Sequence, residues 1–208
     1  MRFHLMTLIL TAPFALAGCG AGSVFDPPIV ASMPNVETQS GFTYSGGPLF
    51  TSDGAYAIRV GDSGGNDARR GFLRFDLSSI PAGATIEDAE LRIGQYSVVG
   101  TPYTSLGAVL VDHVTMGVNF DAADWGAAAL APNIGTLSSD STLQEKSLNV
   151  TSRVLDDLND GRTTSDFRLR FALTTDFDGA NDYAEFNDLD DTAGNGQIPQ
   201  LIVSYRLP

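Results

Sequence analysis

Cysteine and histidine are almost absent from this 208-residue sequence, and each absence excludes a class of chemistry. Cys19 is the only cysteine, so the chain cannot form an internal disulfide and its stability must come from a packed core. His113 is the only histidine after the first few residues. Its apolar neighbours predict a buried, satisfied histidine rather than a metal ligand or a member of a Ser-His-Asp triad.

Positive charge and long apolar runs are also scarce. Lysine and arginine total 12 against 25 aspartates and glutamates, which gives a formal net charge of −13. Such acidity disfavours nucleic acids and anionic lipids as partners. No run approaches the roughly 18 apolar residues that a membrane-spanning helix needs. Nucleophile elbows, phosphate loops and dinucleotide fingerprints are missing too, so we expect no catalytic activity.

The first residues have the features of an export signal. Arg2 precedes an apolar stretch, residues 5–17, that is too short to span a bilayer. The sequence Leu-Ala-Gly-Cys at positions 16–19 resembles the lipobox of bacterial lipoproteins, which implies that Cys19 is acylated and becomes the mature N-terminus. Glycine rather than aspartate at position 20 implies, by the same resemblance, a lipid anchor at the outer membrane or cell surface. The alternative is an ordinary signal peptide with a chance cysteine.

Composition divides the chain into three parts. Residues 1–18 are the predicted lipoprotein signal peptide. Residues 19–34 are rich in glycine, serine and proline, which predicts a flexible tether. Residues 35–208 are long enough to fold as one domain around a single core without disulfides.

Alternation of apolar and polar residues with a period of two predicts that this domain is all-β. The segment 106–114 is apolar on both faces and predicts a central strand. Short helices are expected within residues 121–129 and 149–161, the second capped by Thr151 and ended by Gly161. Short strands with so few helices predict an antiparallel β-sandwich of jelly-roll type with one or two short helices. The strands are expected within residues 56–60, 69–77, 88–96, 106–114, 167–175, 182–188 and 200–207.

The most distinctive motif lies at residues 71–93. It contains Arg-Phe-Asp-Leu at 74–77, Ser-Ser-Ile-Pro at 78–81 and Gly-Ala-Thr-Ile at 83–86. This segment resembles the start of the DNRLRE-type domain, and the Pro-x-Leu-x-Val-x-Tyr pattern at 199–205 is similar to the last strand of that family. The resemblance implies a jelly-roll sandwich on secreted or surface proteins, often attached to polysaccharide-active enzymes. Some members bind alginate-like glycans, and the resemblance implies no catalysis.

The acidic loop at residues 174–191 is the candidate metal site. Around Gly179 it carries four oxygen-bearing side chains at closely spaced positions: Asp176, Asp178, Asn181 and Asp182. Oxygen ligands around a glycine turn suit Ca²⁺, which takes about six to eight of them. Three further carboxylates could complete the shell if the next loop folds back: Asp188, Asp190 and Asp191. The alternative is a solvated acidic turn, because Asp, Asn and Gly favour turns without a metal.

Arginines recur on the polar faces of the predicted strands. On a solvent-facing sheet they would form a band beside cross-strand acidic partners: Arg59, Arg70, Arg74, Arg92, Arg168, Arg170 and Arg206, with Glu90, Asp76 and Glu185. Guanidinium groups bind carboxylates through paired hydrogen bonds, so the band predicts recognition of carboxylated sugars. The candidate ligand-binding residues are Arg92, Arg168, Arg170, Tyr183, Glu185 and Trp125. The alternative is structural, with ion pairs between strands stabilising the sheet.

Three functions are compatible with these features. The first is a non-catalytic, lipid-anchored surface module that binds polysaccharide, with uronate-rich glycans favoured by the arginine band. The second is a structural or adhesive surface protein that interacts with other proteins and has no glycan ligand. The third is an enzyme such as a polysaccharide lyase. The lack of a recognisable active-site motif argues against an enzyme.

Overall fold

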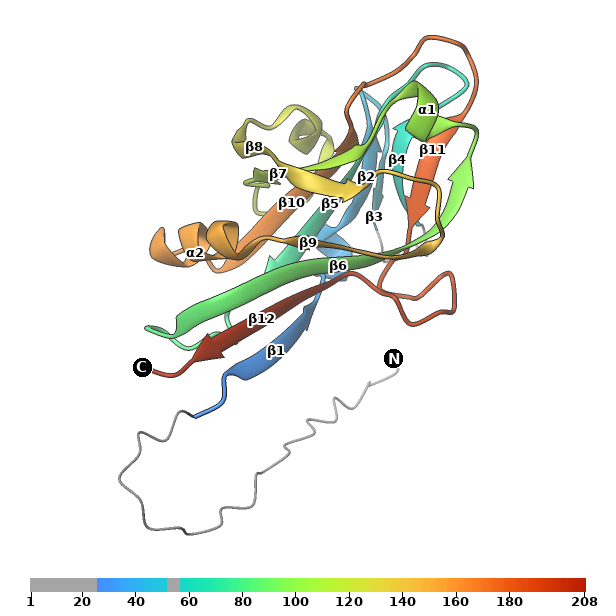
Figure 1. The fold of residues 1–208 in the computed structure, drawn as a ribbon. Helices are drawn as coiled ribbons and strands as arrows, with labels where there is room; N and C mark the ends of the chain where they lie inside the picture. Colours follow the sequence, from blue (N-terminus) through green and yellow to red (C-terminus); the bar gives the residue numbers. More distant parts are fainter. Residues whose placement is uncertain (1–25, 52–56) are drawn as a thin grey trace, which may run out of the picture.

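The computed structural model describes residues 26–51 and 57–208 of the chain. Within these ranges the chain forms one continuous antiparallel sheet of twelve strands, which curls so that two layers enclose a core (Figure 1). No helix in these ranges combines the length and apolar character needed to cross a bilayer. The predicted all-β sandwich is confirmed. Cys19 and the signal peptide lie outside the described residues.

The sheet follows the order β1-β12-β6-β11-β4-β5-β10-β7-β8, with β2 paired to β3 and β5, and β9 paired to β6. Strand β6 bridges the two layers, because β12 and β11 pair with successive stretches of it. The bounds are β1 Ile29–Pro34, β2 Gly41–Tyr44, β3 Leu49–Thr51, β4 Ile58–Asp62, β5 Arg69–Asp76, β6 Thr85–Val99, β7 Val109–Val114, β8 Ala129–Ser138, β9 Gln144–Asn149, β10 Thr164–Phe171, β11 Asp182–Phe186 and β12 Gln200–Arg206.

The main core contains most of the side chains that the period-two alternation predicted to face inward; Leu173, which lies beyond the end of β10 and is 57 % exposed, is an exception. The buried members close the space between the layers. They include Ile58, Val60, Leu73, Phe75, Leu91, Ile93, Phe167, Leu169, Ala184, Phe186, Leu201 and Val203. Burial of this much apolar surface is the dominant stabilising contribution in a chain without disulfides.

The opposite face of β5 and β7 is also covered, which the sequence did not predict. Phe72, Val114, Met116 and Phe120 form a second apolar cluster there. We call residues 115–128 the cover segment, because two of its members, Met116 and Phe120, pack on this face. The expectation of a solvent-facing arginine band is therefore wrong for the centre of the sheet, where Arg74 is 6 % exposed and Arg168 7 % exposed.

The helices are few and short. The predicted helix within 149–161 is confirmed as α2 (Thr151–Asn159), and Gly161 follows it with a φ of +72°. Thr151 is not its N-cap, a position that Val150 takes; the Thr151 hydroxyl instead accepts a hydrogen bond from the Ala89 N–H at 2.8 Å. The predicted turn within 121–129 is the 3₁₀ helix η3 (Ala122–Gly126). Two further short elements, α1 (Pro102–Ser105) and η1 (Glu37–Gln39), were not predicted.

The N-terminal boundary of the domain also differs from the expectation. Residues 29–34, which we expected within the tether, form β1 and pair with β12 along its whole length, from Ile29 opposite Tyr205 to Pro34 opposite Gln200. Met33 is 6 % exposed and belongs to the main core. The stretch reads Ile-Val-Ala-Ser-Met-Pro, with Ser32 as its one polar residue, so it lacks the apolar-polar alternation that predicted the other strands.

Candidate functional site

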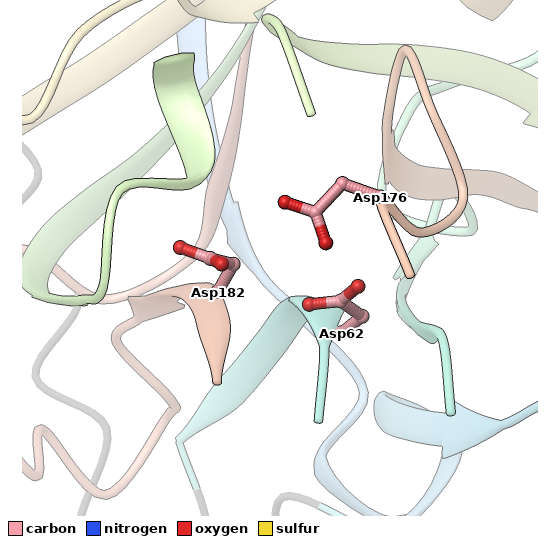
Figure 2. A group of neighbouring side chains, drawn as sticks. All are labelled: Asp62, Asp176 and Asp182. Carbon is pink, nitrogen blue, oxygen red and sulfur yellow. The ribbon is translucent and has the colours of Figure 1, made fainter. Parts of the chain in front are cut away.

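Three aspartates converge where β4 ends and β11 begins: Asp62, Asp176 and Asp182 (Figure 2). Asp62 and Asp182 are direct partners across the two strands. Asp176 comes from the loop between β10 and β11. One carboxylate oxygen of each residue lies within 4.8 Å of an oxygen of both others. We call these three residues the aspartate triad.

Asp62 is the unusual member of the triad. Its side chain is fully buried, and neither carboxylate oxygen has a hydrogen-bond partner of normal geometry. By contrast, Asp182 accepts a hydrogen bond from the Thr101 N–H, and Asp176 accepts one from the Asp178 N–H at 3.1 Å. A buried carboxylate without a partner is costly, so a cation held by the triad would supply an interaction that the surrounding chain does not.

Electrostatics point in the same direction. Burial raises the pKa of Asp62 from its ordinary value of 3.8, and the nearby charges of Asp176 and Asp182 raise it further. The Thr175 hydroxyl and the Asp176 backbone lie close enough to offset part of this rise. Like-charged carboxylates at this distance favour either protonation or a bound cation.

The geometry suits a hard cation. Two oxygens on opposite sides of a Ca²⁺ ion lie about 4.8 Å apart, because each bond is roughly 2.4 Å long. The oxygens of the triad therefore fall within the span of one coordination sphere. Figure 2 shows the three carboxylates grouped around a common space. A donor set made only of oxygen excludes the soft metals that prefer sulfur.

The structure brings together two of the four predicted metal ligands, Asp176 and Asp182. Asp178 accepts a hydrogen bond from the Ala180 N–H at 2.6 Å, and Asn181 accepts one from the Gly64 N–H at 3.1 Å. Neither belongs to the triad. Sequence reasoning missed Asp62, although a signal was present: it follows Ile58 and Val60 at the inward-facing period of β4, where an aspartate is out of place.

The second acidic loop forms a separate network and does not reach the triad. Asp188 accepts hydrogen bonds from the backbone and hydroxyl of Thr192 at 2.9 and 2.7 Å. Asp191 accepts three more, from the Asn187 side chain and from the amides of Asn195 and Gly196, which lower its pKa. These contacts order the connection between β11 and β12.

Three predicted ligand residues lie together: Arg168 and Arg170 on β10, and Trp125 in the cover segment. Both arginines donate to Asp112: Arg168 Nη2 at 2.8 Å and Arg170 Nε at 2.9 Å. The Trp125 carbonyl accepts hydrogen bonds from Arg168 and Arg70, and the Arg70 guanidinium stacks 4.2 Å from the Trp125 ring. These groups are thus engaged with one another, and Asp112, which sequence reasoning missed, is the common partner of Arg168 and Arg170.

The charges of this cluster shift its protonation equilibria. Desolvation by burial lowers the pKa of Arg70 to about 10, and the like charges of Arg168 and Arg170 add to the effect. Burial alone would raise the pKa of Asp112, but hydrogen bonds from both arginines and from the Asn133 amide outweigh it and leave the pKa below 3.8. Asp112 is therefore held as a carboxylate that neutralises part of the arginine charge.

The pair formed by Arg74 and Asp166 fixes the start of the cover segment to the sheet. Arg74 donates to both oxygens of Asp166 at 2.7 Å, and Nη2 also donates to the Met116 carbonyl at 2.9 Å. The Met116 amide in turn donates to Asp166 at 2.9 Å. The arginines of the sheet centre therefore serve to hold backbone, which matches the structural alternative.

The remaining ligand candidates lie elsewhere. Glu185 pairs with Arg59 at 2.8 Å, as predicted, and the Tyr183 ring lies near two guanidinium groups, Arg59 at 5.6 Å and Arg69 at 4.3 Å. Arg92 pairs with Glu90 on the same strand, β6, at 2.6 Å. Asp76, predicted as an arginine partner, instead accepts a hydrogen bond from the Ser78 amide at 2.8 Å. The six candidates do not form one surface.

His113 is buried, as expected, at 1 % exposure. Its Nε2 lies 2.9 and 3.0 Å from the two oxygens of Asp157, while Nδ1 has no partner. Ser165 also donates to Asp157, at 2.5 Å. The aspartate therefore lies between the serine and the histidine, and all three side chains are buried. In a nucleophilic triad the histidine lies between the other two, so this is not such a triad.

Comparison with profiles of known protein families found no match to the chain. Comparison with curated protein sequences found no significant match either. The resemblance of residues 71–93 to the DNRLRE-type domain thus remains a prediction from the sequence, and the function has to be argued from the site.

Proposed function

We propose that this protein is a non-catalytic β-sandwich module that binds Ca²⁺ and polysaccharide at the cell surface, attached there by a lipid on Cys19. The observation that carries the calcium assignment is the buried carboxylate of Asp62, which has no hydrogen-bond partner of normal geometry and faces two further carboxylates. The glycan and the lipid anchor are supported by the sequence features described above.

Calcium fits the triad better than magnesium. Mg²⁺ demands near-ideal octahedral geometry and usually keeps several waters, whereas Ca²⁺ accepts about six to eight oxygens in flexible arrangements. The ligands come from two strand ends and one loop, which do not impose octahedral angles. Backbone carbonyls and water would complete the shell, since three side chains cannot fill it.

A bound cation would act as a cross-link between distant parts of the chain. It would join β4, β11 and the loop between β10 and β11 at one point. That loop is also tied to residues 63–67 by two hydrogen bonds of 3.1 Å, from Gly64 N–H to Asn181 and from Gly179 N–H to Asn66. Calcium would therefore order both loops at this end of the sandwich.

Thermal unfolding of the full-length protein with CaCl₂ and with a chelator tests the calcium assignment. A ligand at 100 times its Kd stabilises the folded state by about 2.7 kcal/mol, so calcium should raise the Tm clearly. Asp62→Asn should abolish this rise. Asp178→Asn, which removes a charge from the same loop outside the triad, should leave it intact. Equal melting curves with calcium and chelator would refute the assignment.

The anchor is tested by mass spectrometry and phase partitioning. Acylation of Cys19 should add the mass of the lipid to a mature chain that begins at this residue. Cys19→Ala should move the protein from the detergent phase to the aqueous phase. A mature chain that begins elsewhere and carries no lipid would remove this part of the proposal.

A structural or adhesive role is the second candidate, and the edge of the sheet favours it. Strand β1 ends the strand order, and its residues Ile29 and Val30 are 41 % and 64 % exposed. An exposed apolar edge strand is a template for pairing with another chain. Concentration-dependent assembly in light scattering, abolished by Val30→Lys, would support this role over glycan binding.

A further inference from the structure

A hollow lies between the β2–β3 hairpin and the turn at residues 63–67. Its volume is about 450 Å³, within the size range of small-molecule sites. The hairpin contributes two aromatic side chains, Tyr44 and Phe50, which we call the aromatic wall, and the turn contributes two polar side chains, Ser63 and Asp67, which we call the polar wall. Aromatic surface opposite a few polar groups is the composition of a binding pocket rather than of a chance depression.

The aromatic wall is held in place from behind. Phe50 stacks on the buried Phe42 with ring centroids 4.7 Å apart, and Tyr44 meets Phe50 edge-on at 6.0 Å. The guanidinium of Arg69 lies 5.1 Å from the Tyr44 ring. Both Tyr44 and Phe50 remain half-buried. Rings fixed in this way lose little conformational freedom when a ligand packs on them.

The polar wall can accept and donate hydrogen bonds. Ser63 Oγ accepts from the amides of Gly65 and Asp67, both at 3.2 Å, which leaves its own hydroxyl proton for a ligand. Asp67 is exposed and offers a carboxylate to ligand hydroxyls. Among the described residues that line the hollow, Asp67 is the one charged side chain, so an anionic ligand would be repelled.

We infer that this hollow is a subsite for one residue of a neutral glycan, with the apolar face of the sugar ring on Tyr44 and its hydroxyls hydrogen-bonded by Asp67 and Ser63. The inference rests on the proposed glycan-binding function and changes its ligand class from uronates to uncharged sugars. Arg168 and Arg170, the basis of the uronate expectation, are already engaged by Asp112.

The subsite and the aspartate triad share one segment. Ser63 directly follows Asp62, and the turn at 63–67 is tied to the acidic loop by the Gly64–Asn181 and Asn66–Gly179 hydrogen bonds. A cation at the triad would therefore position the polar wall of the hollow. Glycan affinity should fall when calcium is removed, even though the cation does not touch the sugar.

A glycan array with neutral and acidic oligosaccharides, followed by calorimetry, tests the subsite in the full-length protein. The strongest neutral oligosaccharide of the array serves as the titrant, with calcium present. Tyr44→Leu and Asp67→Ala should each weaken its binding by about tenfold or more. Trp125→Leu, which removes an aromatic side chain from the arginine cluster, is the matched control and should change the affinity by less than about twofold. Melting curves establish that each variant folds. If Tyr44→Leu does not fold, Asp67→Ala still tests the subsite, because Asp67 is exposed and its replacement should not disturb folding.

The outcomes separate the subsite from the wider proposal. Binding of acidic glycans only, or loss with Trp125→Leu alone, would overturn the subsite and leave polysaccharide binding standing. Neutral binding that neither Tyr44→Leu nor Asp67→Ala weakens would also overturn it. If no glycan on the array binds, the glycan function and the subsite both fail, while a calcium-dependent Tm would still stand.

Discussion

Arg74 and Asp166 form a two-point ion pair, with both hydrogen bonds 2.7 Å long, under the cover segment of the sandwich. Both side chains are almost fully buried, and both also bond to the backbone of Met116. The pair therefore fixes the start of the cover segment to the sheet. Charged residues at these positions of β5 and β10 act in folding and are unavailable to a ligand.

Removal of one partner of this pair should be strongly destabilising. Arg74→Ala leaves the carboxylate of Asp166 buried without a cation, which costs about 3–5 kcal/mol in comparable cases. Arg92→Ala, which breaks an exposed pair with Glu90, should cost about 0–1 kcal/mol. Urea denaturation measures both. Similar losses in the two variants would show that the buried pair contributes no more than a surface one.

Asp62→Asn should stabilise the protein in the absence of calcium. The substitution removes a buried charge that faces Asp176 and Asp182, and its amide can donate to either of them. A gain of about 1 kcal/mol would raise the Tm by about 2–4 °C for a domain of this size. Scanning calorimetry in chelator checks this, and a lower Tm than wild type would contradict it.

The stabilisation by calcium should depend on pH in a defined direction. The pKa of Asp62 in the folded protein without metal lies above 3.8, so the folded state binds this proton more tightly than the unfolded state. Stability from this group is therefore present at low pH and lost as pH rises through the folded pKa. Calcium needs the ionised form, so the Tm difference between calcium and chelator should grow over the same window. A difference that does not change with pH would argue against a carboxylate site.

Gly61→Ala should be more damaging than an ordinary glycine replacement. A Cβ atom at Gly61 would lie 2.1 Å from the Asp182 carbonyl oxygen and 2.6 Å from the Tyr183 Cα, and φ is +134°. Gly161→Ala, with φ of +72° and no atom within 4 Å of the added Cβ, isolates the backbone cost, about 1–2 kcal/mol. We expect Gly61→Ala to cost at least about 2 kcal/mol more. Equal costs in chemical denaturation would mean that β4 and β11 adjust without strain.

The arginine cluster should behave as a unit. Arg168→Ala together with Arg170→Ala leaves Asp112 buried and unpaired, with an expected loss of about 3–5 kcal/mol. Adding Asp112→Leu should recover part of that loss, because no uncompensated charge then remains. Chemical denaturation of the double and triple variants measures both free energies of unfolding. If the triple variant is no more stable than the double, the cost arises from lost contacts to the cover segment instead.

Period-two alternation was enough to predict most strands of the main core, since most of their inward positions carry an apolar residue; it did not predict β1 and β8, which contribute Met33 and Leu137. It failed where a face is covered by something that is not a strand. Arg74 and Arg168 follow the pattern of a solvated face, yet the cover segment buries them, and the contacts responsible join residues about 40 positions apart or more. A pattern in a short stretch of sequence cannot indicate such contacts.

The candidate site was predictable to a similar extent. The acidic loop marked Asp176 and Asp182 because turn chemistry is local, but the partner that completes the triad comes from another strand. Only the register of β4 against β11 places Asp62 opposite Asp182. The hollow beside the triad was missed for a related reason, since its two walls are separated in sequence by the whole of β4.

The pairing of β1 with β12 would determine how the proposed lipid anchor transmits force to the domain. The chain enters the sheet at Ile29 and pairs with β12 residue by residue up to Pro34. A pull from a lipid-bound Cys19 would load these pairs one after another from Ile29, so β1 could peel away while the main core stays closed. Six released residues would lengthen the linker between the lipid and the domain by about 20 Å, so the linker would extend under force before the main core unfolds.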